Sequence, residues 1–177
     1  DEKTRALSEQ LRRAGGPVGL AKDTSNLFRD RAAGFARRLD VRAFRDVLAV
    51  DAAACTLDAE GMVTYEDLVQ ACLAQGVIPA VVPQLKTITL GGAMAGVGIE
   101  ASSHRYGLVH DSALEFEVLL GDGRMVTCTP QNEFADLYFG FPNSYGTLGY
   151  VLRVKARAAP VQPYVRLEHL SFADAGR

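Results

Sequence analysis

Glycines are concentrated in one stretch of the chain, "GGAMAGVGIEASSHRYG", which runs over residues 91–107. Glycine permits backbone conformations and close approaches that a Cβ atom would prevent. The chain must therefore pass close to another backbone or to a ligand in this stretch. Inside it, "GVGIEA" (96–101) has the G-x-G-x-x-A spacing of a dinucleotide-binding fingerprint.

The surroundings of this spacing are not those of a Rossmann fold. There, a core strand leads into the glycines and a helix opens from them with its N-terminus at the pyrophosphate. Here "GGAMA" precedes the spacing and "SSHRYG" follows it, and neither is typical of those elements. Glu115 and Glu117 lie where a ribose-binding acid is expected, but they alternate with apolar residues as the solvent face of a strand. We therefore reject the Rossmann interpretation.

Two other interpretations of the stretch remain open. The glycines can serve only close packing between two lobes. Alternatively, successive N–H groups can bind a flat, charged ligand, with the hydroxyl groups of Ser102 and Ser103 as further donors. In the second case, a side chain at Gly92 or Gly98 should block the ligand and leave a folded chain.

Composition excludes several classes of protein. The chain has 177 residues, 48% of them hydrophobic, which suits one domain of two lobes. A net charge of −2 gives no support to nucleic-acid binding. No apolar run reaches the roughly 18 residues of a membrane-spanning helix. Cys55, Cys72 and Cys128 are widely spaced, so we expect reduced, buried thiols in the cytoplasm and neither a disulfide nor a metal site.

Hydrophobic periodicity and turn residues predict the order of the elements. We expect helices over 4–14, 64–76 and 132–140. We expect strands over 17–21, over 46–61 with a tight turn near Asp58–Gly61, over 77–83, over 113–130 as a hairpin around Asp122-Gly123, over 146–160 and over 164–172. Thr64 is the expected N-cap of the second helix and Gly76 its end. The arginine-rich segment 29–45 is either a solvated edge or a basic rim that faces an anionic cofactor or a membrane surface.

Longer matches point to a family. The run "TITLGGAMAGVGIEASSHRYGLVHD" (87–111) resembles the flavin-binding signature of FAD-linked oxidases of the vanillyl-alcohol oxidase/p-cresol methylhydroxylase type. Within that superfamily it is most similar to the 24-dehydrocholesterol reductase (Diminuto/Dwarf) branch, which has the same G-I-E-x-S-S-H-x-Y-G-L run. The likeness extends over about residues 17–170 and includes "DLYFGFPNSYGTLGYV" (136–151).

The resemblance implies an α+β fold, a two-lobed FAD-binding domain in which a small α/β lobe (1–83) is followed by a lobe with an antiparallel sheet (84–177). FAD would lie between the lobes, and the substrate or cap domain of the family would be absent from this chain. The implied cofactor-binding residues are Lys22, Thr24, Ser25 and Asn26 of a polar turn, Thr89, Gly91, Gly92, Gly96, Gly98, Ile99, Glu100, Ser102, Ser103, His104 and Gly107 of the glycine-rich stretch, and Gly149 and Val151 of a strand against the cofactor.

The resemblance also implies a reaction class. We expect hydride transfer through non-covalent FAD, because residues 17–30 contain no histidine for the covalent attachment that some relatives use. The expected reaction is reduction of a C=C bond in a sterol-like hydrophobic substrate, with NADPH or NADH as the electron donor. An FAD-dependent oxidase or dehydrogenase of an alcohol, hydroxy acid or sugar is the first alternative, and a non-catalytic nucleotide-binding module is the second. We expect a cytoplasmic protein with peripheral membrane association, and no catalytic residue can be named from these residues.

Overall fold

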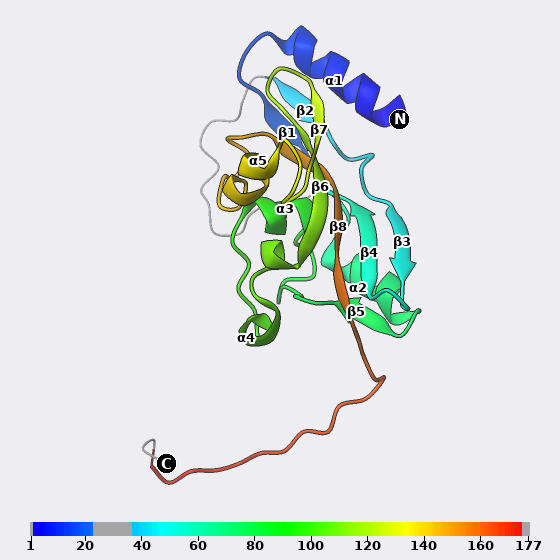
Figure 1. The fold of residues 1–177 in the computed structure, drawn as a ribbon, viewed down its shortest axis with the longest axis vertical. Helices are drawn as coiled ribbons and strands as arrows, with labels where there is room; N and C mark the ends of the chain where they lie inside the picture. The colour runs from blue at the N-terminus through cyan, green and yellow to red at the C-terminus, as the bar shows by residue number, and fades with distance from the viewer. Residues whose placement is uncertain (1, 23–36, 175–177) are drawn as a thin grey trace.

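The computed structural model describes residues 2–22 and 37–174 of the chain. Its main sheet has six strands in the order β3-β4-β8-β6-β7, with β5 also paired to β8 (Figure 1). Every pairing in this sheet is antiparallel. The strands are β3 (Val47–Asp51), β4 (Thr56–Glu60), β5 (Val77–Pro79), β6 (Ala113–Leu119), β7 (Met125–Cys128) and β8 (Tyr150–Pro160). A second, parallel sheet pairs β1 (Gly19–Ala21) with β2 (Arg38–Asp40). The α+β prediction and the antiparallel sheet are confirmed.

The long strand β8 joins elements from both parts of the chain. It pairs with β4 on one side and β6 on the other, and its last residues pair with β5. Strands that precede residue 83 and strands that follow it therefore share one sheet. The division into lobes at 1–83 and 84–177 stays a prediction.

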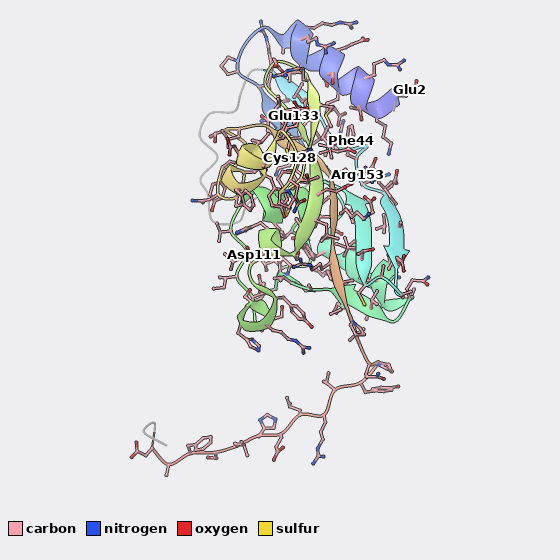
Figure 2. The ribbon with its side chains drawn as sticks, in the orientation of Figure 1. Glu2, Phe44, Asp111, Cys128, Glu133 and Arg153 are labelled. Carbon is pink, nitrogen blue, oxygen red and sulfur yellow. The ribbon has the colours of Figure 1, made fainter. Side chains whose placement is uncertain are left out.

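The two faces of the sheet have different chemistry. On one face, the side chains of Leu57, Phe116 and Val154 are buried in the main hydrophobic core, against helices α2 (Tyr65–Leu73) and α3 (Leu90–Ala95). On the other face, Arg153 of β8 (labelled in Figure 2) lies between the acidic strands β4 and β6. Its Nε donates to Asp58 at 2.8 Å and its NH1 to Glu117 at 2.7 Å. The predicted position of Glu117 on the face away from the core is confirmed.

Helix α2 forms as its end residues predict. The Thr64 hydroxyl accepts from the Asp67 N–H at 3.2 Å, which caps the helix N-terminus. Gly76 follows the helix with φ of 75°, a left-handed conformation that favours glycine. The hairpin around Asp122-Gly123 is also confirmed, with Gly123 at φ 84°. Helix α5 (Ala135–Gly140) occupies the predicted third helical segment.

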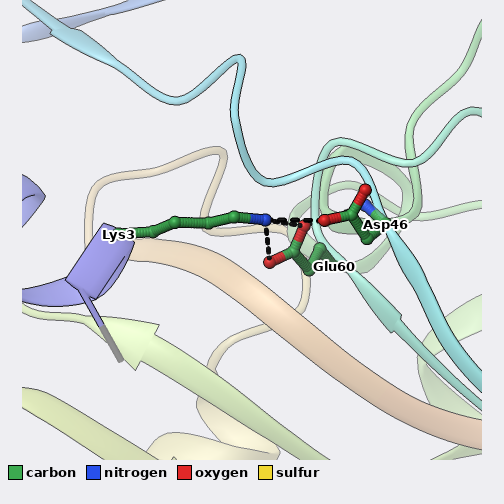
Figure 3. A network of polar contacts seen from close by, with 3 residues as sticks. All are labelled: Lys3, Asp46 and Glu60. Carbon is green, nitrogen blue, oxygen red and sulfur yellow. Dashed lines mark hydrogen bonds and ion pairs between the residues drawn. The ribbon is translucent and has the colours of Figure 1, made fainter.

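Helix α1 (Glu2–Ala14) closes one end of the molecule over a second, smaller core (Figure 1). Its Leu7 and Leu11 pack with residues that include Leu39 and Phe44. A charged contact ties the start of this helix to the main sheet, because Lys3 Nζ lies 2.7 Å from Asp46 and 3.0 Å from Glu60 (Figure 3). The Glu60 side chain is only 7% exposed and also accepts from the Asp46 N–H at 2.8 Å.

Two predictions about strands were wrong. The turn between β3 and β4 lies at residues 52–55, with Cys55 at φ 52°, and not near Asp58–Gly61. Pairing with β8 holds β4 in extended form as far as Glu60, opposite Arg153. Residues 164–172 form no strand in the described part of the chain, although their apolar and polar residues alternate. A strand needs a partner for its N–H and C=O groups, and this segment extends away from the sheet (Figure 1).

The glycine-rich stretch contains two short helices. These are α3 at its start and α4 (Ser103–Tyr106). The Thr89 hydroxyl caps α3 by accepting from the Gly92 N–H at 3.2 Å. Burial of Leu90, Ala93 and Met94 in the core then stabilises a helix that glycine alone would disfavour.

Replacing Lys3 by Met should destabilise the fold, because it leaves the buried Glu60 carboxylate without its cation. We expect a loss of about 1–2 kcal/mol in the free energy of unfolding at pH 7, measured by urea denaturation. The hydrogen bond from Lys3 lowers the pKa of Asp46 below its ordinary value of 3.8. The stabilisation from the Lys3–Asp46 pair is present at pH values above 3.8 and is lost as the pH falls through the lowered pKa of Asp46. The loss of stability in the variant should therefore be smaller at pH 3 than at pH 7.

The control for this prediction is Arg13→Met on the same helix. Among the described residues Arg13 is paired with Glu9 alone, and its side chain is 80% exposed. We expect a change below about 0.5 kcal/mol. Equal effects of the two substitutions would contradict the role given to the buried carboxylate.

Candidate functional site

A cavity of about 520 Å³ lies beside α3, in the size range of small-molecule sites. Most of its wall comes from residues 83–100, and the rest comes from the end of β1, the residues after β4 and the start of β8. The residues in its wall are Leu20, Lys22, Gly61, Met62, Pro83, Leu85, Thr87, Ile88, Thr89, Gly91, Gly92, Ala93, Ala95, Gly96, Val97, Gly98, Ile99, Glu100, Tyr145, Gly146, Gly149, Tyr150 and Val151. We call this cavity the α3 cleft.

The N-terminus of α3 does not offer free donors to a phosphate. The Leu90 N–H donates to Val63 O at 2.9 Å and the Gly91 N–H to Gly61 O at 2.8 Å. The third N–H group, that of Gly92, donates to the Thr89 hydroxyl. A Rossmann fold needs these groups for the pyrophosphate, so the rejection of that interpretation agrees with the geometry.

Free donors occur instead where α3 ends. Within the described part of the chain, the N–H groups of Val97, Gly98 and Ile99 have no hydrogen-bond partner. All three residues line the α3 cleft. Three successive N–H groups without protein partners are an arrangement that can bind carbonyl or anionic oxygens of a ligand.

Several glycines of the cleft are required by the protein itself. A Cβ atom at Gly61 would overlap the Val151 carbonyl oxygen, and one at Gly91 would lie 2.9 Å from Gly61 O. A Cβ atom at Gly98 would lie 2.7 Å from Val109 Cγ2. This contact opposes the expectation that a side chain at Gly98 leaves the fold intact, which stays a prediction. Close packing and ligand access both apply to this stretch, and at Gly98 they coincide.

The charge in the cleft wall is sparse. Among the described lining residues, Lys22 is the single cation and Glu100 the single anion. The hydroxyl of Tyr65 is buried near this carboxylate. Burial, and after it the charge of Glu100, raise the pKa of the Tyr65 hydroxyl well above its ordinary value.

The structure brings most of the predicted site residues into one wall. Those that line the α3 cleft are Lys22, Thr89, Gly91, Gly92, Gly96, Gly98, Ile99, Glu100, Gly149 and Val151. Thr24, Ser25 and Asn26 lie outside the described residues. The part each plays in binding stays a prediction.

Four predicted residues lie beside the cleft wall and hold the backbone. The Ser102 hydroxyl donates to Ala80 O at 3.0 Å, and the Ser103 hydroxyl accepts from the Glu100 N–H at 2.9 Å. His104 Nδ1 lies 2.9 Å from Ala101 O. Gly107 has φ of 78° and ends α4. Ser103 and His104 thus set the path of the chain around Glu100.

Tyr145 lines the cleft and was not predicted. It has φ of 49°, unusual for an aromatic residue, and its N–H donates to Ala95 O at 2.9 Å. The ring lies against Gly96, because a Cβ atom there would be 3.7 Å from Tyr145 Cε1. The segment before β8 therefore caps the end of α3. In the sequence, the only signal for this segment was the family resemblance of residues 136–151. Nothing in that run distinguishes Tyr145 from its neighbours.

Replacing Gly98 by Ala should destabilise the fold through contact with Val109, since the φ angle at Gly98 itself permits alanine. We expect a loss of about 1–3 kcal/mol in the free energy of unfolding. Val109→Ala removes the atom that the new methyl group would meet. In a double-mutant cycle the pair should therefore cost less than the sum of the single variants, by about 1 kcal/mol or more. Additive losses would show that Gly98 is not held by this packing.

Comparisons with known proteins agree with this geometry. A family model described as "FAD binding domain" matches residues 3–129. The chain is 34% identical to the Delta(24)-sterol reductase of Pisum sativum over 131 residues, and 38% identical to that of Homo sapiens over 122 residues. These matches cover 74% and 69% of this chain but only 23% of each relative. The chain thus spans about a quarter of the length of these relatives.

A solved structure shares the fold. The 6-hydroxy-D-nicotine oxidase of Arthrobacter nicotinovorans superposes with a TM-score of 0.78 at 19% identity, over 89% of this chain and 35% of that one. The family model covers well over half of the chain, and the fold agrees with it. The chain belongs to the FAD-binding domain family.

Proposed function

We propose that the α3 cleft binds FAD non-covalently and that the chain is the cofactor-binding part of a flavin-dependent oxidoreductase. The observation that carries the proposal is a cleft walled by glycine backbone, with three N–H groups at 97–99 that have no partner in the described chain. Bound FAD supplies hydride transfer. The residues of this chain bind and orient it.

The wall of the cleft supports non-covalent binding. No histidine or cysteine is among its described residues. Cys72 and Cys128 are buried in the main core, where burial raises the pKa of each thiol to about 11 and keeps it unreactive.

We propose reduction of a C=C bond in a sterol-like hydrophobic substrate, with a reduced nicotinamide, NADPH or NADH, as the electron donor. The relatives named Delta(24)-sterol reductase support this substrate class. Exposed apolar side chains in the cleft wall support it independently, since Val97 is 45% exposed and Ile99 is 74% exposed. The alternative is an oxidase or dehydrogenase of an alcohol, hydroxy acid or sugar.

A hydrophobic substrate would be taken from, or carried near, a lipid surface, so we propose a cytoplasmic protein in peripheral contact with membranes. In the described ranges, 2–22 and 37–174, no helix is long and apolar enough to cross a bilayer. Residues 29–36 of the arginine-rich segment 29–45 lie outside those ranges.

Filling the cleft should abolish FAD binding without harming the fold. Val97→Trp places a large ring at an exposed position of the cleft wall. Leu148→Trp is the matched control, because Leu148 is also 45% exposed but does not line the cleft. We expect FAD affinity, measured by quenching of flavin fluorescence, to fall at least about tenfold in the first variant only.

This titration should be carried out on the full-length protein. Equal affinity in the wild type and both variants would mean that FAD lies elsewhere. A wild type that binds ADP but no FAD would favour the non-catalytic nucleotide-binding module.

A further inference from the structure

The two charges of the α3 cleft come from segments that lie far apart in the chain. Lys22 directly follows β1, whereas Glu100 lies on the segment between α3 and α4. Both residues line the cleft. A ligand that occupies the cleft therefore meets one cation and one carboxylate.

The backbone of Glu100 is held in place, and its side chain has no partner among the described residues. Its own N–H donates to the Ser103 hydroxyl at 2.9 Å, which ties the residue to the first turn of α4. Within the described chain, no hydrogen bond or ion pair involves its carboxylate. Glu100 is also partly shielded from solvent. This carboxylate can therefore accept a hydrogen bond from a donor of a bound ligand.

The residues just before Glu100 carry the complementary groups. The N–H groups of Val97, Gly98 and Ile99 are donors, and the Glu100 carboxylate is an acceptor. Four consecutive residues thus present donors beside one acceptor. The pyrimidine edge of a flavin presents the reverse pattern, an N–H group flanked by two carbonyl oxygens. A pyrophosphate has only acceptors, and the Glu100 carboxylate would repel it.

We propose that Glu100 accepts a hydrogen bond from the flavin N3–H and so sets the direction in which FAD lies, with its pyrophosphate toward Lys22. This inference rests on the proposed binding of FAD. It makes Glu100 a residue that distinguishes a flavin nucleotide from a plain adenine nucleotide. A negative charge at this edge also disfavours the anionic reduced flavin, so it lowers the midpoint potential.

The test compares FAD with ADP, which has the pyrophosphate but lacks the flavin. Glu100→Ala removes a charge-assisted hydrogen bond to the flavin, so FAD affinity should fall about tenfold or more while ADP affinity stays the same. Lys22→Gln should weaken FAD and ADP alike. Both affinities can be measured by isothermal titration calorimetry on the full-length protein.

The isosteric variant Glu100→Gln gives a second measurement. It keeps an acceptor oxygen and removes the charge, so the bound flavin should have a higher midpoint potential than in the wild type. A role of Glu100 in folding alone would leave this potential unchanged.

Three results would overturn the inference. Tighter binding of both FAD and ADP by Glu100→Ala would place the carboxylate beside the phosphates. Unchanged FAD affinity together with an unchanged midpoint potential in Glu100→Gln would leave it without contact to the ligand. A wild-type protein that binds no FAD would overturn the proposed function as well, which separates that failure from the other two.

Discussion

The α3 cleft depends on a contact between three backbones that only glycine allows. Gly61 follows β4, Gly91 lies in the first turn of α3, and Val151 belongs to β8. The Gly61 N–H donates to Leu152 O at 2.8 Å, and Gly61 O accepts from the Gly91 N–H at 2.8 Å. A Cβ atom on either glycine would meet the Val151 carbonyl oxygen. Because no side chain separates these segments, α3 rests directly on the central strand.

This contact occupies the N–H groups at the N-terminus of α3, which in a Rossmann fold would remain available to bind the pyrophosphate. Hydrogen bonds to Gly61, Val63 and the Thr89 hydroxyl satisfy the N-terminal N–H groups of the helix. The donors without partners are displaced to residues 97–99, past the other end of the helix. The first part of the glycine-rich stretch therefore serves packing, and its second part serves ligand access and, at Gly98, packing against Val109 as well. The G-x-G-x-x-A spacing (96–101) begins where α3 ends, and a Rossmann fold would have a helix begin there. The spacing therefore does not indicate a Rossmann dinucleotide site in this chain.

Local features of the chain were predictable where neighbouring residues decide the structure. Thr64, Asp67 and Gly76 define helix α2 by themselves, and Asp122-Gly123 defines the β6–β7 hairpin. Prediction failed where a distant partner decides. β4 continues to Glu60 because Arg153 lies opposite on β8, and residues 164–172 remain unpaired because they extend away from the sheet (Figure 1). Tyr145 enters the cleft for the same kind of reason, since its N–H is tied to Ala95, fifty residues earlier in the chain.

The sequence by itself determined the family, the α+β class and the segment that carries the site, because long runs of residue identity and local turn chemistry are independent of contacts between distant segments. Only the tertiary structure decided which glycines serve packing, which N–H groups remain free, and that Lys22 and Glu100 share one cleft. Those properties depend on distances between β1, α3 and β8, segments that lie far apart in the chain. Spacing along a sequence does not contain such distances, and the hydrogen bonds that remain unmade are known only once the others are formed.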